Sequence, residues 1–421
     1  MEQVEQLGQQ VMQVLPRAAA AACLCPEDLR PEDLTPENFL PRLRTQLLVL
    51  QATPLCNINC SYCYLPQRDD RSRMAITTVR LAARRLREDG LLGDALTVVW
   101  HAGEPLVLPP AYYEEALTAI AQELPGCEVT HAVQSNATLI SEVWCSFFLK
   151  HGVQLGVSVD GPAHLHDTHR RTRQGRGTHA QVQRGMALLR ARGVPFHAIA
   201  VVSAATLAEP DVFYDWFAAQ GVTELGCNFD EAEGVNRQSS LAGHEAAHAD
   251  FMARLLERSL HGPVVVRELA AAWRALREPM PRWQWLQGQN QHRWPVNSQV
   301  QPLALVTVAH DGSFTTFSPE LLGQQAPAFG NFVLGHVQQG GYTQALHGPA
   351  FARLWSAIAD GIGACEKSCA YFDICGGGAP ANKFYEHGSF AATETLHCRS
   401  MVQRPFNAVL QRAEQALGQA A

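Results

Sequence analysis

The chain has 421 residues, of which 47% are hydrophobic, so it is long enough to bury a large core. A net charge of −7 argues against a general attraction to nucleic acid or to anionic membranes. No apolar run reaches the roughly 18 residues that a membrane-spanning helix needs, and the start of the chain is acidic where a secretory signal would be basic. These features predict a globular, cytoplasmic protein with neither nucleic acid nor a membrane as partner.

Short β-rich runs alternate with longer amphipathic runs over the first half of the chain. Six runs predict strands: Gln46–Ala52, Leu96–His101, Val129–Gln134, Gln154–Val159, Phe196–Val202 and Glu224–Phe229. Intervening runs predict helices: Ile76–Arg87, Ala111–Leu124, Ser141–His151, Gln181–Arg192 and Pro210–Gln220. The alternation predicts an α/β fold with a parallel sheet. Six β/α units are too few for the usual closed eight-unit barrel, so we expect a partial (β/α)6 TIM-like barrel with a lateral opening.

Three cysteines, Cys56, Cys60 and Cys63, lie on the loop after the first predicted strand. In a cytoplasmic protein, clustered thiols are more often metal ligands than disulfides. Three thiolates at this spacing can bind three corners of a [4Fe-4S] cluster and leave the fourth iron without a protein ligand. Because clusters that only carry electrons usually have four cysteine ligands, this spacing predicts a cluster that binds a reactant.

The motif C-x3-C-x-aromatic-C, with Tyr62 before the last cysteine, resembles the signature of the radical S-adenosylmethionine (SAM) enzymes. The resemblance implies that the open iron binds the methionine part of SAM. It also implies that one electron cleaves the sulfonium to give a 5′-deoxyadenosyl radical, which the protein directs at a single carbon–hydrogen bond.

Polar segments after the next predicted strands resemble the SAM pocket of this family. The stretch 101–105 is similar to its G-G-E-P loop, with Ala102 replacing the first glycine; a small residue still permits close backbone approach. The stretches 134–137 and 158–161 resemble ribose-contacting segments, and 166–170 resembles one whose arginine meets the methionine carboxylate. The residues thereby implied to bind SAM are Tyr62, Ala102, Gly103, Glu104, Ser135, Asn136, Ser158, Asp160 and Arg170. Zinc binding by His164, His166 and His169 is an alternative for part of this region.

A second set of cysteines, Cys365, Cys369, Cys375 and Cys398, supplies four thiolates. Four thiolates saturate either a [4Fe-4S] cluster or a zinc ion, and the C-x3-C and C-x5-C spacings favour iron-sulfur. The set resembles part of the SPASM extension of radical SAM enzymes that modify peptides, which normally holds two auxiliary clusters on seven cysteines. No cysteine lies between Cys227 and Cys365, so we expect one auxiliary cluster, and a gap in place of the other.

That gap makes Glu320 a candidate acid/base or peptide-binding residue; the alternative is a solvated carboxylate after a β-hairpin. The stretches 48–66, 317–323 and 375–383 resemble GrrM-type radical SAM/SPASM maturases, grouped with enzymes that form three-residue cyclophanes. The resemblance implies a small, glycine-rich ribosomal precursor peptide as partner and a flavodoxin or ferredoxin as electron donor. It also implies a bond between an aromatic ring carbon and the β-carbon of the residue two positions later.

Three alternatives to cyclophane formation remain open: a thioether-forming peptide maturase, an anaerobic sulfatase-maturing enzyme, and an iron-sulfur scaffold that binds peptides without catalysis. The predicted domains are a helical segment at 1–41, the radical SAM barrel at 42–240, a helical connector at 241–299 and a SPASM-like domain at 300–421.

Overall fold

The computed structural model describes residues 43–277, 283–286, 292–295 and 297–420. A ten-stranded sheet lies at its centre, in the order β12-β11-β10-β1-β2-β3-β4-β5-β6-β7. The six predicted strands are confirmed as neighbours in chain order, and all of them are parallel. Their bounds are β1 Leu47–Leu50, β2 Ala95–Trp100, β3 Glu128–Ser135, β4 Gln154–Ser158, β5 His197–Val202 and β6 Glu224–Phe229.

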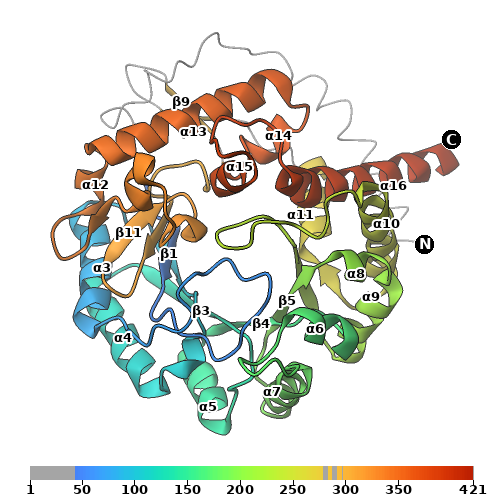
Figure 1. Ribbon diagram of the computed structural model, residues 1–421, viewed down its shortest axis with the longest axis horizontal. Helices are drawn as coiled ribbons and strands as arrows, with labels where there is room; N and C mark the ends of the chain where they lie inside the picture. Colours follow the sequence, from blue (N-terminus) through green and yellow to red (C-terminus); the bar gives the residue numbers. More distant parts are fainter. Residues whose placement is uncertain (1–42, 278–282, 287–291, 296, 421) are drawn as a thin grey trace.

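Helices cover the outer side of this curved sheet and leave the ring of strands open at one side (Figure 1). The five predicted helices are confirmed, and two short ones, α6 and α8, add to them. Their bounds are α3 Ile76–Glu88, α4 Pro110–Glu123, α5 Glu142–His151, α6 Ala163–His169, α7 His179–Ala191, α8 Ala204–Leu207 and α9 Pro210–Ala219. The α/β partial barrel predicted from the sequence is therefore confirmed.

Local sequence sets the ends of these helices. In α5 the hydroxyl of Ser141 accepts a hydrogen bond from the N–H of Trp144, which satisfies one of the free donors of the first turn. The helix ends at Gly152, whose φ of 61° lies in the left-handed region that glycine adopts without strain.

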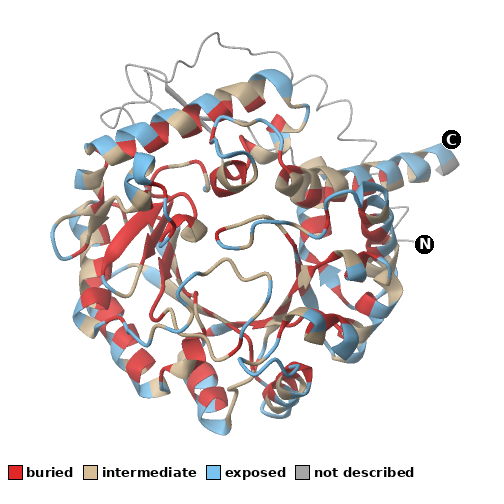
Figure 2. Cartoon of the chain, viewed as in Figure 1, coloured by how far each residue is buried: buried red, intermediate tan, exposed pale blue. Residues whose placement is uncertain are grey.

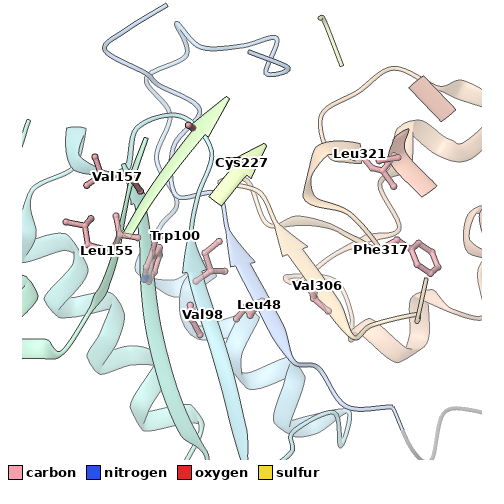
Figure 3. Packing of buried hydrophobic residues seen from close by; sticks show 14 of the residues in the cluster. Leu48, Val98, Trp100, Leu155, Val157, Cys227, Val306, Phe317 and Leu321 are labelled. Carbon is pink, nitrogen blue, oxygen red and sulfur yellow. The ribbon is translucent and has the colours of Figure 1, made fainter. Parts of the chain in front are cut away.

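The core lies between the strands and the inner sides of the helices, where buried residues gather (Figure 2). Strands β1 and β4 are almost continuously buried, as expected for a parallel sheet covered on both faces. Trp100 at the end of β2 packs edge-to-face on Tyr113 of α4, with 5.1 Å between ring centroids. Figure 3 shows Leu48, Val98 and Leu155 pointing into the same apolar interior.

The sheet is longer than the six predicted units because later segments extend both of its ends. The two-residue strand β7, Val265–Val266, pairs parallel with β6. At the other end β10, Leu305–Val308, pairs parallel with β1 and leads into β11, Ser313–Thr316, and β12, Gly335–His336. The sequence predicted only the β-hairpin before Glu320, which β10 and β11 form. Sequence patterns of four residues or fewer carry little signal, which explains why the other strands were not predicted.

The predicted connector, 241–299, holds two helices, α10 Glu245–His261 and α11 Arg267–Arg277. It also holds β7 and an antiparallel pair, β8 Trp283–Leu286 and β9 His292–Pro295, in a region where the sequence predicted mostly helix. The predicted segment 1–41 lies outside the described residues. The domain boundaries themselves stay predictions.

The C-terminal region contacts both ends of the open sheet. At one end of the sheet it supplies the edge strand, β12. At the other end its last helix, α16, packs on α10 and α11. Its elements run along the open side of the ring in Figure 1. They are η4 Pro319–Leu321, η5 Pro327–Phe332, α12 Tyr342–Ala345, α13 Pro349–Ser368, α14 Phe372–Cys375, α15 Pro380–His387, η6 Cys398–Gln403 and α16 Arg404–Ala420. Among the described residues, no helix is long and apolar enough to cross a membrane.

Candidate active site

A cavity of about 290 Å³ lies at the carboxyl ends of the parallel strands, where the loops after β1, β2, β3 and β6 meet. This is the end at which barrels of this type carry their functional residues. Most residues that the sequence predicts at the site line this cavity. They are Cys56, Cys60, Tyr62, Cys63, Ala102, Gly103, Glu104, Asn136, Ser158, Arg170 and Glu320.

The cysteine loop is held by its neighbours rather than by regular structure. The N–H of Asn59 donates to the carbonyl of Arg171 at 2.6 Å, and the N–H of Ser61 donates to that of His169 at 3.1 Å. The guanidinium of Arg68 donates to the carbonyl of Cys60 at 2.9 Å. These bonds attach the loop to the end of α6 and aim the three thiols into one cavity.

The donor set fits an iron-sulfur cluster by its chemistry. Burial raises the pKa of Cys56 to about 12 and that of Cys60 to about 11, and a thiol gives up its proton when it binds a metal. No group of three Cys, His, Asp or Glu side chains within the described ranges forms a ready-made metal site. That Cys56, Cys60 and Cys63 hold a cluster stays a prediction, which their thiol chemistry and their shared cavity support.

Glu104 follows β2 and is held by three donors. Its carboxylate accepts from the hydroxyl of Ser135 at 2.7 Å, from the N–H of Asn136 at 2.8 Å and from the N–H of Leu106 at 3.1 Å. The side chain is only 1% exposed, and burial raises its pKa to about 7 although the donors lower it. A cationic group in the cavity favours the ionised carboxylate.

The residues before Glu104 show why this turn needs small side chains. At Gly103, with φ of 61°, a β-carbon would lie 2.4 Å from the carbonyl oxygen of Thr53, so only glycine fits. Ala102 has φ of 75°, a conformation that costs an L-residue about 1 kcal/mol. The replacement predicted to be tolerable is accommodated, but with backbone strain.

Arg170 lines the cavity as part of a buried group of polar side chains. One oxygen of Asp160 accepts from the Arg170 guanidinium at 3.0 Å and from the Tyr62 hydroxyl at 2.6 Å; the other accepts from the N–H of Val201 at 2.9 Å. Burial raises the pKa of Asp160, but Arg170 and the other donors outweigh this and hold it below its usual range. Asp160 is therefore an ionised anchor for Arg170.

Two predicted SAM contacts, Ser135 and Asp160, stand behind the cavity wall and are 1% and 2% exposed. Both hydrogen-bond to residues that do line it, Glu104 and Arg170. Their place fits a positioning role better than the direct contact that the sequence predicted.

The zinc alternative for the three histidines is not supported by their contacts. His164 pairs with Glu209 at 2.9 Å, His166 contacts the hydroxyl of Thr178 at 3.0 Å, and His169 contacts that of Ser61 at 2.8 Å. Each ring thus has a separate partner.

Glu320 lines the cavity rather than open solvent, and the structure brings two further carboxylates to it, Glu231 and Glu233. The last two follow β6, so their position after a predicted strand was the available signal. Burial and the neighbouring carboxylates raise the pKa of Glu233 well above its usual range, and burial raises that of Glu320 as well. Tyr385 donates to the backbone carbonyl of Glu320 at 2.9 Å.

The second cysteine set assembles from several elements of the C-terminal region. Cys365 continues the buried apolar face of α13, Cys369 ends that helix, Cys375 ends α14 and Cys398 begins η6. Cys375 and Cys398 line a separate cavity of about 450 Å³, where the amide of Asn297 donates to the carbonyl of Cys375 at 2.7 Å.

A hydrogen-bonded pair joins the two regions. His397, next to Cys398, contacts Glu231 of the first cavity at 2.6 Å through Nδ1. Asn382 donates to the same carboxylate oxygen at 2.7 Å. This contact therefore joins a residue that lines the barrel cavity, Glu231, to one that lines the cavity of Cys375 and Cys398.

Comparison with known proteins agrees with this geometry. Residues 50–217 match the radical SAM superfamily. An uncharacterized protein of Synechocystis is 33% identical over 385 residues, which cover 89% of this chain and 93% of the relative. The chain belongs to the radical SAM superfamily. As a radical SAM protein it also matches a serine-type anaerobic sulfatase-maturating enzyme of Bacteroides thetaiotaomicron, with 27% identity over 49% of this chain and 52% of that enzyme.

Solved structures share its fold at low identity. Native anSMEcpe with bound AdoMet and Cp18Cys peptide superposes with a TM-score of 0.69 and 18% identity, over 90% of this chain and 100% of that one. Streptococcus suis SuiB bound to the precursor peptide SuiA superposes with a TM-score of 0.56 and 14% identity, over 92% and 86%. The similarity extends over the barrel and the C-terminal region.

Proposed function

We propose that this radical SAM enzyme modifies a ribosomally made precursor peptide and forms a cyclophane cross-link in it. The observation that carries the proposal is the continuous cavity that runs from the three cysteines to Glu231, Glu233 and Glu320. Such a cavity would bring a radical source and candidate bases to the same substrate. Support for a peptide substrate comes from relatives whose structures contain peptides, namely Cp18Cys and SuiA.

Cys56, Cys60 and Cys63 would hold a [4Fe-4S] cluster with one open iron. When SAM and reduced cluster are bound, they supply a carbon-centred radical by one-electron cleavage of the sulfonium. Glu104 would accept from the ammonium of SAM, and Arg170 would donate to its carboxylate. Ser135 and Asp160 keep these two charged groups in place through the hydrogen bonds described above.

The carboxylates at the far side of the cavity would handle the protons of the substrate. When a β-carbon joins an aromatic ring, the ring carbon must lose its hydrogen as a proton to become aromatic again. Glu320 would accept that proton: it lines the cavity, and burial raises its pKa, which makes its ionised form a stronger base than an exposed carboxylate. The electron lost at the same time needs an acceptor.

We assign that electron to an auxiliary [4Fe-4S] cluster on Cys365, Cys369, Cys375 and Cys398. Support comes from the contact between Glu231, which lines the cavity, and His397, the neighbour of Cys398 in sequence. A flavodoxin or ferredoxin would supply the electron that starts each cycle.

A second candidate, maturation of a sulfatase, is favoured by the sequence match to the sulfatase-maturating enzymes. It is weakened by the lack of any cysteine between Cys227 and Cys365, where the family resemblance expects ligands of another cluster. A thioether-forming maturase is compatible with the same cavity.

Co-expression with the small peptide encoded beside the gene, followed by mass spectrometry, tests the proposal. A cyclophane lowers the peptide mass by two hydrogens, and fragmentation stops between an aromatic residue and the residue two positions later. A thioether-forming maturase would instead consume one free thiol of the peptide. A sulfatase-maturing enzyme would leave an aldehyde, which a hydrazide reagent detects. A peptide whose mass never changes would contradict the proposal.

A further inference from the structure

Lys383 of α15 is a buried lysine whose ammonium contacts a backbone carbonyl and a thiol. The residue is 2% exposed, and its Nζ donates to the carbonyl of Gly361 at 3.1 Å and to the Sγ of Cys365 at 3.2 Å. Within the described ranges, no ion pair joins it to an acidic side chain. Taking an ammonium out of water costs several kcal/mol unless a negative group compensates.

The surrounding backbone is shaped to let this side chain reach the cysteines. A β-carbon at Gly361 would lie 2.1 Å from the carbonyl oxygen of Phe390 and 3.2 Å from Nζ. A β-carbon at Gly378 would lie 3.4 Å from the Lys383 side chain and 3.5 Å from the Sγ of Cys398. The lysine therefore lies close to both glycines and reaches the Sγ of Cys365 in α13, while the Sγ of Cys398 in η6 lies beside the same glycine as the lysine's Cε.

The missing negative charge is what four thiolates around iron and sulfide would provide. A [4Fe-4S] cluster on four cysteines carries a net negative charge, and reduction adds one more. A fixed cation at hydrogen-bond distance from a ligand sulfur stabilises the reduced state more than the oxidised one, because the attraction grows with the cluster's charge. Hydrogen bonds to the sulfurs act in the same direction.

We propose that Lys383 is a positioning and tuning residue of the auxiliary site: it holds Cys365, compensates the charge of the thiolates and raises the reduction potential of the cluster. A higher potential would suit an acceptor of the electron released from the substrate. The inference rests on the proposed auxiliary cluster, and its test is designed to separate the two.

The experiment uses the full chain with Cys56, Cys60 and Cys63 all replaced by alanine, so that only the auxiliary cluster contributes a signal. Lys383→Met is introduced into this background, and the potential is measured by a redox titration followed by electron paramagnetic resonance. We expect the midpoint to move to a more negative value. The matched control is Lys367→Met, since Lys367 also lies near Cys365 and Cys369 in sequence but is exposed, where water and salt screen its charge. Its shift should be several-fold smaller.

Lys383→Met could lose iron simply because the site no longer folds. Lys383→Arg addresses this case, because it replaces the same side chain but keeps the positive charge. If Lys383→Met binds no iron while Lys383→Arg keeps about four irons and a potential near that of the parent, the charge is required and the inference holds. If Lys383→Met keeps the parent potential, or if Lys367→Met shifts it equally, the inference is wrong. If the parent variant binds zinc or no metal, the auxiliary cluster itself is wrong, and the role of Lys383 falls with it.

Discussion

Cys56, Cys60 and Cys63 lie within a single loop, whereas Cys365, Cys369, Cys375 and Cys398 come from separate elements of the C-terminal region. The surroundings differ in charge as well. Beside the first set lie two groups of opposite charge, Glu104 and Arg170, and beside the second lies the buried ammonium of Lys383. The charges at the first site suit the binding of a zwitterion such as SAM, and the cation at the second suits a negatively charged cluster. Under the proposed function, the first site carries out the chemistry and the second accepts an electron.

Replacing Cys56, Cys60 and Cys63 together by alanine should separate the two sites most sharply. All SAM cleavage should be lost, while iron falls from about eight to about four per chain, because the second site keeps its ligands. Iron analysis and chromatography of 5′-deoxyadenosine measure both. Continued 5′-deoxyadenosine production would mean that the first site does not hold the catalytic cluster.

Gly103→Ala should damage only the first site. The new β-carbon would meet the Thr53 carbonyl at 2.4 Å, so the turn that carries Glu104 must move. We expect SAM cleavage to fall by roughly 100-fold or more, since small displacements of positioning groups have effects of this size. Gly93→Ala, at a glycine with open space around it, is the control and should be silent. Equal activity of the two variants would contradict the cavity assignment.

Glu104→Gln removes the negative charge but keeps the shape. Loss of one charge-assisted hydrogen bond of about 1.5–3 kcal/mol raises the dissociation constant of SAM by about 10- to 100-fold. Because burial places the pKa of Glu104 near 7, protonation below that pH should weaken SAM binding to the wild type. The same acidification should leave Glu104→Gln nearly unaffected. Calorimetry at several pH values would measure the dissociation constant of SAM for both proteins and show whether only that of the wild type depends on pH.

Glu320→Gln should slow product formation by roughly 100-fold and leave SAM cleavage intact, because a general base acts after the radical is made. Burial raises the pKa of Glu320, so its carboxylate becomes protonated at a higher pH than an exposed glutamate. The activity of the wild type should therefore decline as the pH falls through the pKa of Glu320. Glu115→Gln, on the exposed face of α4, is the control. If Glu320→Gln forms product at the wild-type rate, Glu320 is not the base. Glu231 and Glu233 would then be the next residues to replace.

Ala102→Gly should have the smallest effect. Glycine relieves the strain of φ at 75°, and the greater freedom of the unfolded chain offsets part of the gain. The net result should be a free energy of unfolding raised by less than about 1 kcal/mol, measured from the denaturant midpoint. A decrease in stability would show that the alanine methyl contributes packing that outweighs its backbone strain.

The parts predicted well from sequence are those whose signal is local. The β1–β6 strands and their helices have clear periodicity, and the motif from Cys56 to Cys63 needs only eight consecutive residues. Short strands such as β7 and β12 were missed because two residues carry no pattern, and the β8–β9 pair lies where helix was expected. Glu231 and Glu233 were missed although they follow a predicted strand, because that position alone does not show which cavity they face.

The sequence by itself determined the parallel α/β barrel, the three-cysteine loop and the order of polar segments after successive strands, because each depends on neighbours within one turn or one strand. Tertiary structure alone decided that Ser135 and Asp160 support Glu104 and Arg170 from behind the cavity wall. It also decided which residues meet across long stretches of chain, such as Glu231 with His397 and Lys383 with Cys365. The physical reason is that burial and charge compensation arise only when distant segments pack together.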